Sequence, residues 1–176
     1  MLEAIKKRLK DCKLEINQQK SKIVYCRRNQ KRQPLFKPKY QKFDFLGHTF
    51  KPRVVKERGK FKLGFSPAIS HKSQKRISGE LYKLKIHRMV HVPLTKIAEI
   101  LRARTRGWIN YFGKFRLSEM RKVFRVLNFR LARMVRSKYK YRRFRNRHWY
   151  ESYKWLKAIS KDYPTLFVHW ENGFYP

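Results

Sequence analysis

The sequence predicts an α+β fold, with a short β-containing region at residues 1–66 and a mostly helical region at residues 67–176. In the first region, apolar residues occur in short runs bounded by glycine and proline, which is typical of strands and turns. In the second region, apolar residues recur every three or four positions, which is the period of an amphipathic helix. Hydrophobic residues make up 41% of the 176-residue chain. That proportion is enough to form a folded core.

Three elements are predicted before the main strands. Met1–Cys12 should be a helix, because its apolar residues lie on one helical face. Ile23–Tyr25 should be a strand, because it is a run of β-branched and aromatic residues. Arg27–Lys42 is basic and contains two prolines, so it should be a loop.

Two β features follow. Phe43–Arg53 alternates phenylalanine with polar residues, and we predict a strand that is bent at Gly47. Val54-Val55 and Phe61–Phe65 are separated by the polar turn Lys56–Lys60, so they should pair as a hairpin.

Three long helices are predicted in the second region. The first covers Ser70–Arg88 and begins at its serine N-cap. The second begins near Pro93 and continues to Phe115, with one apolar stripe. The third covers Ser118–Tyr139, also with a serine N-cap, and places its apolar residues on one narrow face and most of its arginines on the other. The chain should end with a short helix at Glu151–Ser160 and an extended aromatic tail at Pro164–Trp170.

Gly107 lies on the outward face of the second predicted helix. A glycine in a helix interior costs about 1 kcal/mol relative to alanine. Two interpretations remain open at this position: a large partner approaches the bare backbone, or the helix bends or frays there.

The charge of the chain indicates an anionic partner. There are 47 lysines and arginines against 11 aspartates and glutamates, for a net charge of +36. Nucleic acid is the first candidate partner and an anionic membrane surface is the second. No apolar run approaches the roughly 18 residues of a membrane span, and the N-terminus has no signal-peptide core. Cys12 and Cys26 form no CxxC motif, so we expect reduced thiols and a cytoplasmic protein.

The cations of the predicted helices form the candidate RNA-binding set. A solvated helix face usually mixes both signs of charge, but the chain has no acidic residue between Glu119 and Glu151. Arginine can grip a phosphate with two hydrogen bonds, and aromatic rings among arginines can stack on unpaired bases. Phe129 belongs to this set because it lies off the apolar stripe. The set comprises Lys75, Arg76, Arg102, Arg106, Asn110, Lys114, Arg121, Lys122, Arg125, Phe129, Arg130, Arg133, Arg136, Lys138, Lys140, Arg142, Arg143, Arg145 and Arg147.

The histidines do not indicate a catalytic or metal site. His87 and His91 have the spacing of two metal ligands on a helix, but no third ligand lies nearby in the sequence. His169 and Trp170 are interpreted as packed aromatic structure and not as a catalytic pair. We therefore predict no metal site and no catalytic residue.

Several motifs, in order, resemble the C-terminal part of bacterial group II intron reverse transcriptase/maturases. Leu14–Asn17 and Lys20–Tyr25 resemble the end of the palm, and Phe43–Phe50 resembles the primer-grip strand pair. Gly107–Gly113 and Lys138–Lys140 resemble the maturase-specific thumb, which is also called domain X. Leu166–Trp170 resembles the usual ending. One departure is Met134, where such proteins more often carry tryptophan.

The resemblance implies a domain division and further site residues. Residues 1–66 would be the end of the palm with its primer grip, and residues 67–176 would be the thumb. Phe45, Leu46 and Gly47 would be primer-grip-like, although a core strand with a bend explains them equally well. Lys20 would match a palm lysine near the incoming nucleotide, and the alternative is a phosphate contact or plain surface charge.

The function that the resemblance implies is binding of group II intron RNA to assist splicing and intron mobility. Template–primer nucleic acid is a second expected partner. Two further candidate partners are a second copy of this chain, in a homodimer, and the N-terminal polymerase part of the family. We expect no binding to a membrane. The alternatives are RNA-directed DNA polymerase (reverse transcriptase) activity of the intact parent protein, and a generic basic RNA-binding or ribosomal protein.

In this family the polymerase aspartates lie upstream of the position where Met1 begins. Two-metal phosphoryl transfer needs clustered carboxylates that hold two cations about 3.5–4 Å apart. The aspartates of this chain are Asp11, Asp44 and Asp162, which are far apart in the sequence. We therefore expect that this chain alone uses no cofactor and does not extend a primer, and that Mg²⁺ serves only the intact polymerase.

Overall fold

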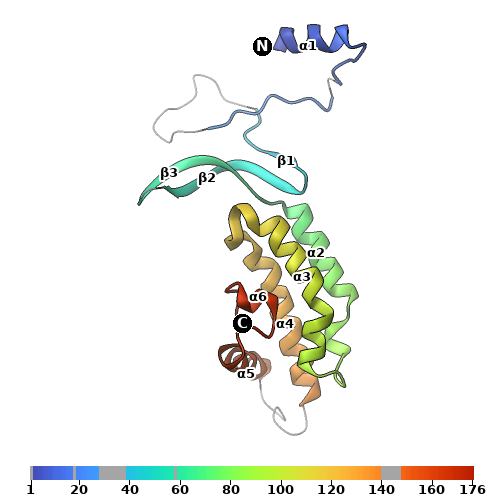
Figure 1. The fold of residues 1–176 in the computed structure, drawn as a ribbon, viewed down its shortest axis with the longest axis vertical. Coiled ribbons are helices and arrows are strands. Elements are labelled where there is room, and N and C mark those ends of the chain that lie inside the picture. Colours follow the sequence, from blue (N-terminus) through green and yellow to red (C-terminus); the bar gives the residue numbers. More distant parts are fainter. Residues whose placement is uncertain (1, 18, 28–38, 58, 140–147) are drawn as a thin grey trace. The chain divides into compact units, whose positions relative to one another are not determined.

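The computed structural model describes residues 2–17, 19–27, 39–57, 59–139 and 148–176. A three-stranded antiparallel sheet is followed by long helices, which confirms the predicted α+β class (Figure 1). The chain forms two compact units. The first unit comprises Met1–Phe43 and Phe50–Ser66, and the second comprises Asp44–Thr49 and Pro67–Pro176.

The first unit begins with the predicted helix, α1 (Leu2–Asp11). The predicted strand at Ile23–Tyr25 is wrong, because this segment is not part of a strand or of the sheet that the described residues form. The Tyr25 amide donates to the Tyr40 carbonyl, and the Ile23 side chain is 75% exposed. The β propensity of a residue depends on its packing against neighbouring strands, and Ile23 has little such packing. Of the predicted loop Arg27–Lys42, residues 28–38 lie outside the described part of the chain.

The sheet contains β1 (Phe43–Phe45), β2 (His48–Glu57) and β3 (Lys60–Ile69), in that order. The predicted hairpin around residues 56–60 is confirmed, since β2 and β3 pair on either side of it. The single bent strand predicted for Phe43–Arg53 is wrong. A turn at Leu46-Gly47 separates β1 from β2 instead.

The described residues of the second unit contain five α-helices. Figure 1 shows α2, α3 and α4 roughly aligned and α5 nearly end-on. The five helices are α2 (His71–Lys83), α3 (Leu94–Arg116), α4 (Arg121–Lys138), α5 (Trp149–Asp162) and α6 (Val168–Glu171). Two 3₁₀ turns connect them, η1 (Ile86–Arg88) between α2 and α3, and η2 (Leu117–Met120) between α3 and α4.

Several helix starts and ends differ from the predictions. The Ser70 N-cap is confirmed, because its hydroxyl oxygen accepts the Ser73 amide at 3.1 Å. The first helix ends earlier than predicted, because Lys85 adopts a left-handed conformation with φ 47°. Ser118 is not an N-cap, since it lies within η2 and its side chain makes no capping hydrogen bond. Pro164–Trp170 is not extended throughout, because its end forms the start of α6.

The core of the second unit is centred on α4. Buried residues occupy most of the circumference of α4, and not the narrow face that the sequence predicted. The reason is that α2, η1, η2 and α5 all pack against this helix. One side of α4 therefore remains exposed, and the side chains on that side are available to a partner.

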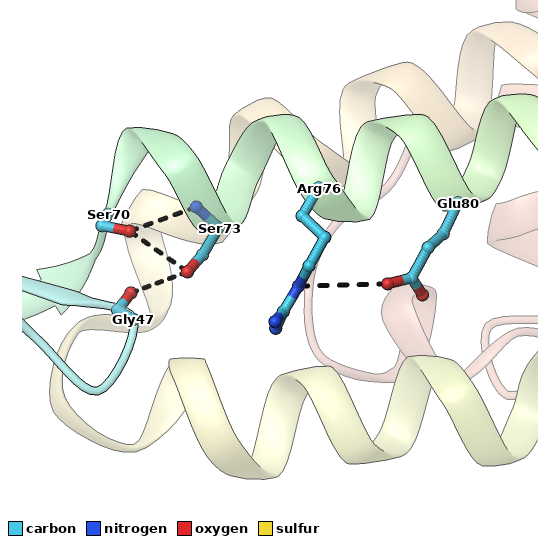
Figure 2. A network of polar contacts seen from close by, with 5 residues as sticks. All are labelled: Gly47, Ser70, Ser73, Arg76 and Glu80. Carbon is cyan, nitrogen blue, oxygen red and sulfur yellow. Dashed lines mark hydrogen bonds and ion pairs between the residues drawn. The ribbon is translucent and has the colours of Figure 1, made fainter.

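The turn between β1 and β2 is fixed to the helices of the second unit. Leu46 and Gly47 both have positive φ, 46° and 77°, which is the geometry of a two-residue hairpin turn of type I′. The Gly47 carbonyl accepts the Ser70 amide at 2.9 Å and the Ser73 hydroxyl at 3.0 Å, and the latter bond is drawn in Figure 2. The Tyr111 hydroxyl donates to the Leu46 carbonyl at 2.8 Å. These bonds hold the turn in one position while the Leu46 side chain remains 68% exposed.

Glycine at position 47 should be required, whereas glycine at position 107 should not. An added Cβ at Gly47 would lie 2.9 Å from the Ser73 Oγ and 3.2 Å from the Phe112 ring, at a positive φ. Gly47→Ala should therefore lower the free energy of unfolding by more than the roughly 1–2 kcal/mol that a left-handed residue costs. An added Cβ at Gly107 would meet nothing within 4 Å, so Gly107→Ala should raise the free energy of unfolding by about 1 kcal/mol. Urea unfolding of both variants measures these changes, and equal effects would contradict the role of the turn.

The C-terminal segment inserts polar side chains into the core beside α4. His169 and Trp170 are fully buried, as the interpretation of packed aromatic structure predicted. The Asn128 Oδ1 accepts the Trp170 Nε1–H at 3.1 Å and lies 2.8 Å from the His169 Nε2. The same amide donates from its Nδ2 to the Phe174 carbonyl at 3.0 Å. Because an amide oxygen can only accept, the His169 Nε2 carries a proton. Burial lowers the pKa of the ring, so the ring is neutral and its Nδ1 is unprotonated.

Mild acid should destabilise the protein through His169. Burial lowers the pKa of this ring from 6.5 to about 3. The unfolded chain gains a proton below pH 6.5 that the folded chain does not, so the stabilisation is complete above pH 6.5 and is lost as the pH falls. The free energy of unfolding should fall by about 1.4 kcal/mol per pH unit well below pH 6.5, or by roughly 2 kcal/mol between pH 6.5 and pH 4.5. Urea unfolding across this range should show that the free energy of unfolding changes less steeply with pH in His169→Gln than in the unaltered chain. The exposed-site control His71→Gln should keep the full slope, and equal slopes in both variants would contradict the assignment.

Candidate nucleic-acid interface

The exposed side of α4 forms a single row of side chains. Their spacing of three, four, four and three residues places them on one face of the helix. All five side chains are exposed, whereas the residues on the other faces are mostly buried. We call this row the α4 stripe. It comprises Lys122, Arg125, Phe129, Arg133 and Arg136.

Aromatic side chains of α5 lie beside the α4 stripe. The Phe129 ring centroid is 5.7 Å from that of Trp149 and 5.2 Å from that of Tyr153. The Tyr150 ring stacks on Tyr153 with centroids 6.3 Å apart. We call these four residues the aromatic patch. Phe129, Trp149 and Tyr150 are each between 41% and 46% exposed, so apolar ring surface lies next to arginine side chains.

The position of Phe129 differs in one respect from the prediction. The sequence predicts an exposed ring among arginines, and the ring is indeed 41% exposed. It is not isolated, however, because two rings of α5 pack against one side of it. The sequence reasoning missed the α5 residues because the predicted helix began at Glu151. The spacing of Trp149, Tyr150 and Tyr153 is the signal that could have identified them.

Tyr153 is a hydrogen-bond donor at neutral pH. Burial raises the pKa of its phenol, and the positive charge of Arg125 opposes that shift only in part. The hydroxyl therefore stays protonated and faces a surface that carries nearby arginine charge. A protonated phenol beside a guanidinium can donate to an anion together with it.

Two of the predicted contact residues have other roles. Arg130 is 9% exposed, and its guanidinium lies 3.4 Å from the centroid of the Tyr82 ring, a cation–π contact between α4 and α2. The prediction that Arg130 lies on the outward face is therefore wrong. Lys138 is half-buried, and its Nζ donates to the Val92 carbonyl at 3.0 Å. Both cations stabilise the packing of the helices.

The predicted residues of α3 and α2 are exposed. Four of them follow each other at four-residue steps along the outward face of α3, namely Arg102, Arg106, Asn110 and Lys114. On α2, Lys75 is exposed. Arg76 is exposed and forms an ion pair with Glu80 at 4.0 Å, which Figure 2 shows. An ion pair at the surface contributes little to stability.

Positive charge also acts on His87 of η1. Partial burial lowers the pKa of its ring, and the nearby charges of Arg133 and Arg130 lower it further. The positive field of α4 therefore reaches the adjoining 3₁₀ turn.

The remaining predicted residues are placed as follows. Lys140, Arg142, Arg143, Arg145 and Arg147 lie outside the described part of the chain. Phe45 and Leu46 are exposed at the turn that Gly47 forms. Lys20 is exposed in the first unit, where its amide donates to the Asn17 side chain.

Within the described ranges, no group of three or more histidine, cysteine, aspartate or glutamate residues could hold a metal ion. In the same part of the chain, no helix has the length and apolar character needed to cross a membrane.

Two substitutions in α4 should separate folding from binding. Leu127 is fully buried, so Leu127→Ala should lower the free energy of unfolding by about 2–5 kcal/mol through a core cavity. Phe129→Ala should cost less, because the ring is 41% exposed and loses only its contacts with α5. Folded Phe129→Ala should bind RNA more weakly, by roughly 1–3 kcal/mol if one base stacks on the ring. Paired melting and binding measurements test this, and normal binding by folded Phe129→Ala would exclude the ring as a stacking surface.

The comparison with protein families concerns the helical part of the chain. Residues 74–155 match the family model of the group II intron, maturase-specific domain. No curated protein and no solved structure gives a significant match. The matched range extends from α2 into α5, so it contains the α4 stripe and the aromatic patch. The resemblance predicted from the sequence is thereby confirmed: residues 74–155 are similar to the maturase-specific domain, domain X, of group II intron proteins.

Proposed function

We propose that this chain binds group II intron RNA and assists its folding for splicing and intron mobility. The observation that carries the proposal is the position of the α4 stripe beside the aromatic patch, within the range that matches the maturase-specific domain. Cations supply sequence-independent contacts with phosphates, and exposed rings supply stacking on unpaired bases. A folded RNA that exposes both phosphates and loop bases fits such a surface.

The electrostatic part of the binding has a measurable consequence. A chain with a net charge of +36 neutralises several phosphates at once and releases their counterions. The logarithm of the binding constant then falls with the logarithm of the salt concentration, by about 0.7 per contacted phosphate for single strands and about 0.9 for duplex DNA. A protein with six to ten such contacts loses about 10³- to 10⁵-fold in affinity between 50 and 200 mM salt.

Template–primer binding is proposed as a second function, for a protein in which a polymerase part is also present. The supporting observation is the turn at Leu46-Gly47, which presents the exposed side chains of Phe45 and Leu46. Non-glycine residues with positive φ concentrate at functional sites, and hydrogen bonds from α2 and α3 hold this turn in place. The primer-grip role and the palm role of Lys20 belong to this proposal.

Fluorescence anisotropy with labelled RNA tests the first proposal. The probes are a group II intron RNA and an unrelated structured RNA of equal length, each titrated between 50 and 200 mM salt. We expect a steep salt dependence for both and tighter binding of the intron RNA at the higher salt concentration. A slope near zero would contradict RNA binding through the cations. Equal affinities at all salt concentrations would favour the generic RNA-binding alternative.

A further inference from the structure

A pocket lies at the junction of α4, α5 and the C-terminal segment. It has a volume of about 230 Å³ and is lined by Arg121, Arg125 and Asn128 of α4, Tyr153 of α5, and Gly173, Phe174 and Tyr175. The pocket is larger than a single ion requires and smaller than the roughly 300–1,000 Å³ of the usual site of a drug-sized ligand.

The two arginines are the charged residues of the pocket lining. Arg121 and Arg125 are one helical turn apart, so their side chains lie on the same side of α4. Both are exposed, and neither has an ion pair with any described acidic residue. Two adjacent guanidinium groups without a carboxylate favour an anion, and their planar forks match the oxygens of a phosphate.

The other lining groups add a donor and a ring. The Tyr153 phenol remains protonated at neutral pH, since burial raises its pKa, and it can donate a hydrogen bond. The Asn128 amide is already engaged with the C-terminal segment, so it forms a wall of the pocket and not a ligand. The Tyr175 ring is 48% exposed and can stack on a base. An added Cβ at Gly173 would meet nothing within 4 Å, so this side of the pocket is open.

We propose that this pocket binds one unpaired RNA nucleotide, with its phosphate held by Arg121, Arg125 and Tyr153 and its base stacked on Tyr175. The proposal rests on the proposed function, because Arg125 also belongs to the α4 stripe and Tyr153 to the aromatic patch. It goes further by naming the RNA feature that is recognised. A base paired in a duplex cannot present its face to Tyr175, so the pocket selects single-stranded RNA.

Two matched pairs of variants test the pocket in the full chain. Tyr175→Ala removes the stacking ring, and Tyr163→Ala is its control at another exposed tyrosine. Arg121→Gln removes one phosphate contact, and Arg104→Gln is its control on α3 outside the pocket. The probes are a single-stranded RNA oligomer and an RNA duplex. Melting curves first establish that each variant is folded.

Tyr175→Ala should bind the single strand roughly 5- to 150-fold more weakly, which is the range for the loss of one stacked base, and should bind the duplex as before. Arg121→Gln should reduce the salt slope for the single strand by about 0.7. Both controls should behave like the unaltered chain. The proposal is overturned if the pocket variants match their controls, or if duplex binding falls as much as single-strand binding.

A competition experiment distinguishes a nucleotide pocket from a simple phosphate site. Adenosine 5′-monophosphate should displace the single strand at a lower concentration than inorganic phosphate does, and Tyr175→Ala should abolish this difference. Equal competition by both anions in the unaltered chain would overturn the stacking of a base. If the chain keeps its preference for intron RNA while the pocket variants match their controls, the proposal of a nucleotide pocket is wrong and the proposed function still holds. If the chain binds neither RNA, the proposed function itself fails.

Discussion

Replacing Asn128 with alanine should lower the free energy of unfolding by roughly 3–9 kcal/mol, because three buried groups would lose their partner at once. The Trp170 Nε1–H and the His169 Nε2–H would lose their acceptor, and the Phe174 carbonyl would lose its donor. Each buried polar group without a partner costs about 1–3 kcal/mol. The C-terminal segment should detach from α4 before the helices unfold, since these bonds tie it to the core.

Asn172→Ala is the matched control for this prediction. The Asn172 side chain donates one hydrogen bond, to the Val168 carbonyl within its own segment. Its removal should cost about 1 kcal/mol, the usual net contribution of a single hydrogen bond. Urea unfolding followed by the fluorescence of the four tryptophans, which include the buried Trp170, reports on both variants. Similar losses in the two variants would contradict the central position of Asn128.

The second large effect should appear in RNA binding. A variant of the α4 stripe with Lys122→Gln, Arg125→Gln and Arg133→Gln should bind intron RNA at least about 100-fold more weakly at physiological salt. Hydrogen bonds to charged groups contribute about 1.5–3 kcal/mol each, and each 1.4 kcal/mol is a tenfold change in affinity. The salt slope should fall by about 2, since three phosphate contacts are lost.

The control for the α4 stripe removes the same number of charges from α1. Lys7, Arg8 and Lys10 are exposed in the first unit, outside the matched range of residues 74–155. The triple glutamine variant at these positions should bind intron RNA nearly as well as the unaltered chain. Equal losses in the two triple variants would show that only net charge matters and would contradict a defined binding surface on α4.

Sequence reasoning identified most features that depend on local patterns. Apolar periodicity placed the long helices, and the Ser70 cap followed from the residue type at a helix start. The hairpin of β2 and β3 followed from two apolar runs around a polar turn. Periodicity also placed the α4 stripe on one face, since the exposed residues share the heptad spacing.

Features that depend on neighbouring elements could not be predicted in this way. Periodicity placed Arg130 on the outward face of α4, which is wrong, because the Tyr82 ring of α2 covers its guanidinium. Phe129 was correctly placed outside the core, yet its α5 partners follow only from the packing of α4 against α5. The Asn128 hydrogen bonds join residues more than forty positions apart, and no local pattern encodes such a pairing.

Photo-crosslinking of a 4-thiouridine-labelled group II intron RNA to the full chain tests the binding surface most directly. The RNA is bound at physiological salt, irradiated and digested, and the crosslinked peptides are identified by mass spectrometry. We expect crosslinks in residues 121–136 of α4 and 149–153 of α5, which hold the α4 stripe and the aromatic patch. Crosslinks confined to residues 2–27 or 50–66, with none in α4 or α5, would contradict the proposed surface.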